Sequence, residues 1–373
     1  MKREPKNYFQ LPLKCYDISG LRNTSNTFYK IISLYILYPL ALILYVMIVI
    51  NFQFKNNSVG EIAEVFTAMT GFGYLILIKS VVIAHGPLLE ELIKRREFLW
   101  KYNSLTTEDG QQFHETMSSA GSTIKLFMII GYISVCVHSV APLFVEKLDL
   151  PHACWIPRNN DLIRKIIYIF EVITYNEIII LIVFFNGFYL LMCTELKIQF
   201  QILCKKIHSM RIDKNGEQLC WQEIKSCSSY HNFLLQMHKV LNTVYSEFFV
   251  CLYFLTVGGV CIPLFVIFDK SAEFDQIVEN IFFSMLTNFI IIMVLYPADE
   301  VEIAAELLVN EIYDIDWYNT HSLKILKFIL FWLAQAQVPV QMSGGGIFQV
   351  NRSLMLRIQR IGYSISSLMT GLK

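Results

Sequence analysis

Polar side chains recur along one face of the last hydrophobic stretch, Ile347–Leu372. They repeat at intervals of four, three, four and three residues, a spacing that keeps them on a single stripe of a helix. The members of this polar stripe are Ser353, Arg357, Arg360, Ser364 and Ser367. Arginine is too costly to present to lipid, so the stripe must face protein or water. It would form either a buried polar seam between helices or, with several copies around an axis, part of a water-filled pore.

No other set of side chains has the spacing of a catalytic or metal site. Glu171 and Glu177 are six residues apart and do not share a helical face. His231 and His238 would align on a helix, but no third ligand accompanies them. The nine cysteines show no metal-ligand spacing and are expected to be packing residues. There is no nucleophile elbow or phosphate-binding glycine loop, so we predict that the chain is not an enzyme and uses no cofactor or metal.

Composition and hydropathy place the chain in a membrane. Of its 373 residues, 54% are hydrophobic and only 17% are charged. These charged residues are too few to cover the surface of a soluble globular protein of this size. The net charge of zero argues against nucleic acid as a partner. Stretches long enough to cross an apolar layer of about 30 Å are Phe28–Ile50, Ala63–Ala84, Thr123–Val145, Ile166–Met192, Ser246–Phe268, Val278–Tyr296 and the more polar Ile347–Leu372. We predict an all-α polytopic membrane protein with seven transmembrane helices embedded in lipid.

The basic residues between these stretches indicate the orientation. Assigning Lys and Arg to alternate sides gives 19 on the side of the N-terminal tail and 6 on the other. Cytoplasmic loops carry the basic excess. We therefore expect a cytoplasmic N-terminus and an extracellular C-terminus.

Charged segments that remain apolar at helical intervals predict helices that extend into the cytoplasm. Segment 193–245 is one, and segment 298–322 is another, with acidic residues and no Lys or Arg. The acidic face would be either merely solvated or a vestibule that concentrates cations. The expected divisions are a cytoplasmic tail (1–27), four crossings (28–192), a helical linker (193–245), two crossings (246–297), anchor helices (298–343) and the seventh helix (344–373). Asn56, in an outer-loop sequon, is a candidate glycosylation site.

Two C-terminal sequences carry a family resemblance: Gly344-Gly345-Gly346-Ile347-Phe348 and Tyr363-Ser364-Ile365-Ser366-Ser367-Leu368-Met369-Thr370. With the order of elements, they resemble the insect odorant receptor family. The resemblance implies a ligand-gated, non-selective cation channel of four subunits in the plasma membrane of sensory neurons. It also implies a heteromer in which a divergent odour-binding subunit assembles with a shared coreceptor. The loop between the fourth and fifth crossings, about fifty residues, is short for the coreceptor. The chain therefore resembles the odour-binding subunit.

The resemblance also implies where a ligand would bind. A small volatile organic molecule would lie in the outer halves of the second, third, fourth and sixth crossings. The candidate lining residues are Phe66, Met69, Tyr74, Cys136, Ser139, Tyr175, Phe282, Phe283 and Met285. Mostly aromatic or soft side chains suit such a ligand, which dispersion and stacking would hold with one or two hydrogen bonds. Ordinary packing between helices is the competing interpretation for each of them.

The gate implied by the resemblance lies at the C-terminal end. It would be the apolar pair Leu368 and Leu372, with Ser364 and Arg357 on the same stripe. Arg357 and Arg360 depart from what a cation pore prefers. Either the partner subunits supply much of the permeation path, or these two arginines turn toward a neighbouring subunit.

Three other classes compete with this interpretation. A gustatory receptor-type channel would share the architecture, but Gln349 and Tyr363 do not fit its terminal pattern. A G-protein-coupled receptor is disfavoured by the orientation and by the missing Asp-Arg-Tyr after the third crossing. A transporter would show internal repeats and broken helices, and the sequence shows no repeat.

Overall fold

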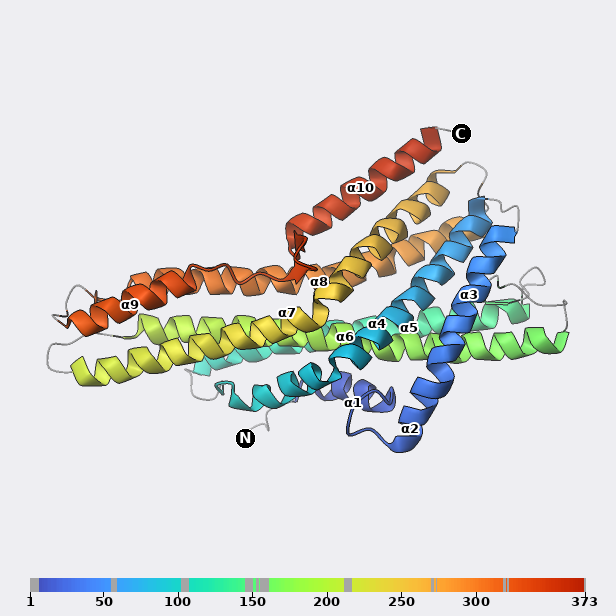
Figure 1. Ribbon diagram of the computed structural model, residues 1–373. Coiled ribbons are helices and arrows are strands. Elements are labelled where there is room, and N and C mark those ends of the chain that lie inside the picture. Colours follow the sequence, from blue (N-terminus) through green and yellow to red (C-terminus); the bar gives the residue numbers. More distant parts are fainter. Residues whose placement is uncertain are drawn as a thin grey trace.

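The computed structural model is an elongated bundle of long helices (Figure 1). It describes residues 7–54, 59–101, 107–144, 150–151, 154, 161–210, 217–269, 272, 274–317, 320 and 322–371. The N-terminal elements are α1 (Gln10–Ile18), α2 (Thr27–Ile31), a π-helical turn (Ile32–Leu37) and α3 (Tyr38–Phe54). The long helices are α4 (Val59–Arg95), α5 (Thr107–Phe144), α6 (Asp161–His208), α7 (Glu217–Phe268) and α8 (Phe274–Tyr313). A 3-10 turn (Arg96–Phe98) follows α4, and the chain continues with α9 (Leu323–Ala336), β1 (Ser343–Gly344), β2 (Phe348–Gln349) and α10 (Arg352–Gly371).

Six helices in the described part of the chain are long and apolar enough to cross a membrane, and α10 follows them as a more polar seventh. The prediction of an all-α, seven-helix membrane protein is confirmed. Helix α6 has 48 residues and α7 has 52, so at 1.5 Å per residue each exceeds an apolar layer of about 30 Å roughly twofold. Figure 1 shows their far ends beside α9, at the end of the molecule away from the C-terminus. These ends are the predicted cytoplasmic extensions.

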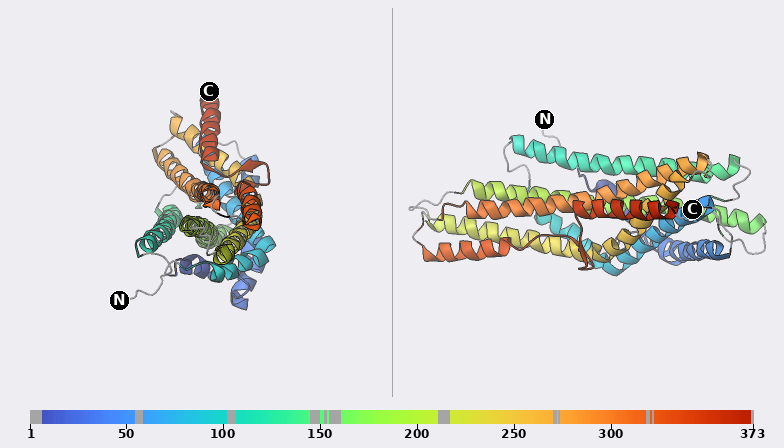
Figure 2. Two further views of the ribbon diagram at one scale, coloured as in Figure 1. Left: turned by 90° about the vertical axis from the view of Figure 1, so that its left-hand side faces the viewer. Right: turned by 90° about the horizontal axis from the view of Figure 1, so that it is seen from above.

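The cytoplasmic extensions pack around α9. Trp332 is fully buried, and its Nε1–H donates to His231 Nδ1 at 3.2 Å. Leu308 and Ile312 of α8 are also fully buried, whereas Leu307 is 50% exposed. The apolar residues of this part of α8 therefore do not all lie on one buried face. Figure 2 shows these long helices side by side from two further directions.

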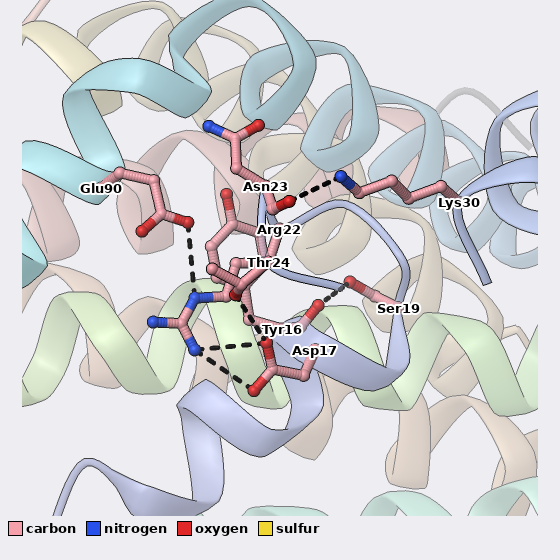
Figure 3. Close-up of polar contacts among 8 residues, drawn as sticks. All are labelled: Tyr16, Asp17, Ser19, Arg22, Asn23, Thr24, Lys30 and Glu90. Carbon is pink, nitrogen blue, oxygen red and sulfur yellow. Dashed lines mark hydrogen bonds and ion pairs between the residues drawn. The ribbon is translucent and has the colours of Figure 1, made fainter. Parts of the chain in front are cut away.

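The segment between α1 and α2 is tied to the cytoplasmic end of α4 (Figure 3). Arg22 lies 3.2 Å from Asp17 of α1 and 3.4 Å from Glu90 of α4. Lys30 Nζ donates to the carbonyl of Asn23 at 2.6 Å. Gly20 has φ of +70°, and a Cβ there would lie 2.3 Å from the Tyr29 carbonyl oxygen. This sharp turn therefore requires glycine.

Helix α4 bends at His85, and an ion pair is buried within the bundle. His85 of α4 has non-helical dihedrals two residues before Pro87, which explains the bend. Lys79 Nζ lies 2.6 Å from Glu177 Oε1 of α6 and donates to the Ser33 carbonyl of the π-helical turn at 3.3 Å. Lys79 is fully buried and Glu177 is 6% exposed. These contacts join the first, second and fourth crossings.

A short hairpin precedes α10 and shortens the seventh helix at its start. Gly345 and Gly346 have positive φ values of 57° and 70°, which glycine adopts without a Cβ clash. They form the turn between β1 and β2, whose register pairs Gly344 with Phe348. The helix consequently begins at Arg352, not at Ile347 as the hydropathy predicts. The Gly345 N–H donates to the Ser246 hydroxyl of α7 at 2.9 Å, so α7 holds the hairpin.

Candidate functional site

A cavity of about 160 Å³ lies among α4, α5, α6, α7 and α8. Each helix contributes side chains three or four residues apart, so each turns one stripe toward the cavity. The lining residues are Thr67, Thr70, Gly71 and Tyr74 of α4; Phe127, Gly131, Ser134, Val135 and His138 of α5; Tyr175, Ile178, Ile179 and Ile182 of α6; Leu252, Leu255 and Thr256 of α7; and Glu279, Phe282, Phe283, Leu286, Thr287 and Ile290 of α8. An apolar, aromatic wall with a few hydroxyls can hold a small uncharged molecule by dispersion and stacking.

Four of the nine candidate ligand residues meet at this cavity: Tyr74, Tyr175, Phe282 and Phe283. The other five lie elsewhere. Phe66 packs against α7, where a Cβ at Gly258 would lie 2.3 Å from its ring. Met69 packs in a separate apolar cluster around Phe72. Cys136 and Met285 are exposed, and Ser139 is buried, with its carbonyl accepting the Tyr168 O–H at 2.6 Å.

Helix α7 lines the cavity, which sequence reasoning did not anticipate. Leu252, Leu255 and Thr256 come from the fifth crossing, whereas the resemblance implies only the second, third, fourth and sixth. Their three- and four-residue spacing fits one helical stripe, but the same spacing also suits ordinary packing. Only the positions of the neighbouring helices show which stripe faces the cavity.

The cavity rests on a hydrogen-bonded aromatic floor. The Tyr74 hydroxyl and the Asn186 side chain exchange contacts of 2.8 and 3.1 Å. The Tyr74 ring meets Phe248 of α7 edge to face at 5.6 Å between centroids. Phe248 in turn contacts Tyr245, whose hydroxyl donates to the Phe185 carbonyl at 2.8 Å. The satisfied polar groups and stacked rings make this floor a rigid support between α4, α6 and α7.

A thin layer of α7 side chains separates the cavity from α10. Leu252 and Thr256 line the cavity and also border a space of about 10 Å³ on their other side. Leu354 and Ile358 of α10 line that second space, and both are buried. A change in the cavity that moves Leu252 or Thr256 would therefore also change the surface of α7 against which α10 packs.

The polar stripe of α10 faces away from its own chain. Its five residues are all exposed, whereas Leu354, Ile358 and Ser366 on the opposite face are buried. Within this chain the stripe is thus not a buried seam between helices. Figure 1 shows α10 on the outside of the bundle, alongside the last part of α7. Leu368 is 65% exposed on this outer surface. Leu372 and the sequon residue Asn56 lie outside the described residues.

A charged cluster fastens the start of α10 to α8. Arg352 pairs with Asp299 at 2.9 Å and also with Glu300, and its guanidinium lies 4.3 Å from the centre of the Tyr296 ring. Lys197 of α6 contacts Glu300 at 2.6 Å. Burial acts to raise the pKa of Glu300, but Lys197 and Arg352 outweigh it and hold that pKa below its usual value. Part of the acidic face therefore forms ion pairs.

Comparison with known proteins assigns the family. A model of the 7tm Odorant receptor family matches residues 58–361. The chain belongs to the odorant receptor family. Odorant receptor Or2 of Anopheles gambiae is 22% identical over an alignment of 343 residues, and the match covers 85% of this chain and 88% of that receptor. This membership confirms that the chain is a membrane receptor and not an enzyme.

Solved structures share the receptor's fold. The olfactory receptor OR5 of Machilis hrabei superposes with a TM-score of 0.79 and 14% identity over 100% of this chain and 93% of that one. The same receptor in complex with eugenol gives a TM-score of 0.80 and 14% identity over 99% of this chain and 100% of that one. At such low identity the likeness establishes the seven-helix fold and nothing about which ligand this odorant receptor binds.

Proposed function

We propose that this odorant receptor is the odour-binding subunit of a heteromeric, ligand-gated, non-selective cation channel in the plasma membrane of sensory neurons. A small volatile organic molecule occupies the cavity, and coreceptor subunits complete the pore. Family membership, the aromatic cavity and the outward polar stripe of α10 support this function. The main supporting observation is that α7 both lines the cavity and contacts the hairpin and α10.

Gating then follows from differential binding. A ligand shifts the closed and open populations only if it fits one better than the other. Leu252 and Thr256 are in contact with the cavity on one side and with the α10 interface on the other. A ligand that favours one position of α7 thereby favours one position of α10. Four outward-facing polar stripes around an axis would line a conduit that one chain cannot enclose.

The first experiment expresses the receptor in cells with and without the coreceptor and records odour-evoked current. We expect a non-selective cation current only with the coreceptor. Robust current from the receptor alone would contradict the heteromer. Current that requires G proteins, without direct conductance, would support a metabotropic receptor instead.

The second experiment tests the role of α7. Leu252→Ala should lower the maximal odour-evoked current several-fold at normal surface level, because it removes the side chain between the cavity and α10. Phe254→Ala is the matched control, since Phe254 is 69% exposed on another face of the same helix. Equal effects of the two substitutions would refute this path of coupling.

A further inference from the structure

A groove of about 500 Å³ opens between α5 and α8 on the cytoplasmic side of the aromatic cavity. The two helices meet where the rings of Phe127 and Phe289 stack, with their centroids 5.5 Å apart. Below this stack, Leu190 and Thr194 of α6 form a buried floor between the two helices. The volume lies in the range of about 300–1,000 Å³ that is typical of pockets for organic ligands.

The lining of this groove changes from apolar to charged toward the cytoplasm. Phe289, Ile292 and Met293 belong to the part of α8 that hydropathy places in the membrane. Glu300 lies four residues beyond the end of that crossing and Lys197 lies five beyond the end of the α6 crossing, about 6 and 8 Å along a helix. The headgroup layer adds about 5–8 Å to each side of the apolar core. The groove therefore spans the boundary between acyl chains and headgroups of the inner leaflet.

The walls of the groove are accessible from the surrounding membrane. Ile292 and Tyr296 of α8 and Ser119 of α5 are all exposed. A membrane lipid can therefore enter from the side without a movement of the helices. An apolar chain would lie against α8, and a headgroup would reach the charged end.

The charged groups of the lining indicate which headgroup fits. They are two carboxylates, Glu115 and Glu300, and the ammonium of Lys197. Glu300 is held by Lys197 at 2.6 Å and also pairs with Arg352. Glu115 accepts a hydrogen bond from the neutral amide of Gln111 at 2.9 Å, which leaves its charge in place. The cytoplasmic end of the groove is therefore negative at Glu115, which favours a headgroup with a positive group there.

The hydrogen-bonding groups beside Glu115 favour an N–H donor. The Thr116 hydroxyl donates its proton to the Gln112 carbonyl at 2.9 Å, so its oxygen offers lone pairs to the groove. A carboxylate likewise only accepts. A primary ammonium carries three N–H donors, whereas a quaternary ammonium carries none. The Lys197 ammonium also has three donors and can contact a phosphate in addition to Glu300.

We propose that this groove binds one inner-leaflet phospholipid with a primary ammonium headgroup, such as phosphatidylethanolamine. An acyl chain lies against Phe289 and Ile292, the phosphate lies near Lys197, and the ammonium lies near Glu115. Glu115 precedes the predicted start of the α5 crossing by eight residues, about 12 Å along a helix. It is thus farther from the apolar core than Lys197, in the same order as ammonium and phosphate in the headgroup. This site is separate from the aromatic cavity and goes beyond the proposed function.

The test uses the purified full-length receptor in phosphatidylcholine nanodiscs with a trace of phosphatidylethanolamine that carries a photoreactive acyl chain. After irradiation, labelled peptides are mapped by mass spectrometry. We expect label on the α5 and α8 walls that unlabelled phosphatidylethanolamine displaces about fivefold better than phosphatidylglycerol, the factor for one exposed ion pair of about 1 kcal/mol. Label near Ile43, which is exposed on α3, is the internal control and should fall equally with both lipids. Absence of label from the groove, or equal displacement there by both lipids, would overturn the inference.

Variants assign the label to the groove and the preference to its charge. Ser119→Trp fills the groove and should remove this label, whereas Ser118→Trp, at an exposed neighbour outside the lining, should keep it. Glu115→Gln keeps the shape without the charge, so label should remain but both lipids should displace it equally. Glu108→Gln, exposed on the same helix outside the groove, is its matched control and should keep the preference.

The two kinds of variant keep the test decisive. Because Glu115→Gln changes no packing, it still gives an answer if Ser119→Trp does not fold. A preference for phosphatidylethanolamine that survives Glu115→Gln would overturn the headgroup assignment. The readout needs neither odorant nor coreceptor, so its failure is distinct from a failure of the proposed function.

Discussion

Removing one member of the buried Lys79–Glu177 pair should destabilise the receptor far more than removing both. Lys79 is fully buried, so Lys79→Met leaves the Glu177 carboxylate in the bundle without its counter-ion. Breaking a buried pair in this way costs about 3–5 kcal/mol. Replacing both residues by apolar side chains of similar volume is often neutral or stabilising by about 1–4 kcal/mol. The double mutant Lys79→Met, Glu177→Met should therefore recover most of the loss.

The assay is the melting temperature of the purified receptor in detergent, with surface level in cells as a second readout. Arg95→Met is the matched control, because Arg95 and Glu91 also lie 2.6 Å apart but are 27% and 39% exposed. A pair exposed to this extent contributes about 0–1 kcal/mol. The reasoning is refuted if Lys79→Met melts like the wild type, or if the double mutant is as unstable as Lys79→Met alone.

Three further predictions concern the cavity, the gate and the cytoplasmic helices. Phe283→Ala should raise the half-maximal odorant concentration several-fold, about 1 kcal/mol of lost stacking; an unchanged dose response at normal surface level would move the ligand elsewhere. The double mutant Leu368→Ser, Leu372→Ser should raise odour-independent current in the complex because a polar constriction hydrates more easily, whereas unaltered basal current would assign the gate to the partner subunits. Burial lowers the pKa of both His231 and His238 to about 4, so between pH 6.5 and 4 the unfolded chain binds more protons than the folded receptor. The free energy of unfolding should therefore be highest above pH 6.5 and should decrease as the pH falls, by about 1–2 kcal/mol per histidine at pH 5. The melting temperature at pH 7 and pH 5 checks this, and a drop undiminished in His231→Gln, His238→Gln would contradict it.

The crossings and their cytoplasmic extensions could be predicted because their signals are local. An apolar run of about twenty residues must form a helix in lipid, since no other structure satisfies its backbone groups there. The same logic extends to α6, where apolar residues such as Leu196 and Phe200 continue at helical intervals beyond the membrane and are buried. The start of α10 was predicted less well. Ile347 is apolar enough for a helix, but the glycines before it form a hairpin that Ser246 of α7 holds.

The sequence by itself determined that this is a seven-helix membrane receptor, and through its C-terminal residues it indicated the family. Only the tertiary structure decided which face of each helix meets the cavity. Tyr74 and Tyr175 line it, whereas Met69 and Cys136 do not, because the rotation of each helix is fixed by neighbours far away in the sequence. The pairing of Lys79 with Glu177, and of His138 with Glu279, likewise joins residues on different helices. Hydropathy and periodicity act within one helix, and these contacts arise from packing between helices.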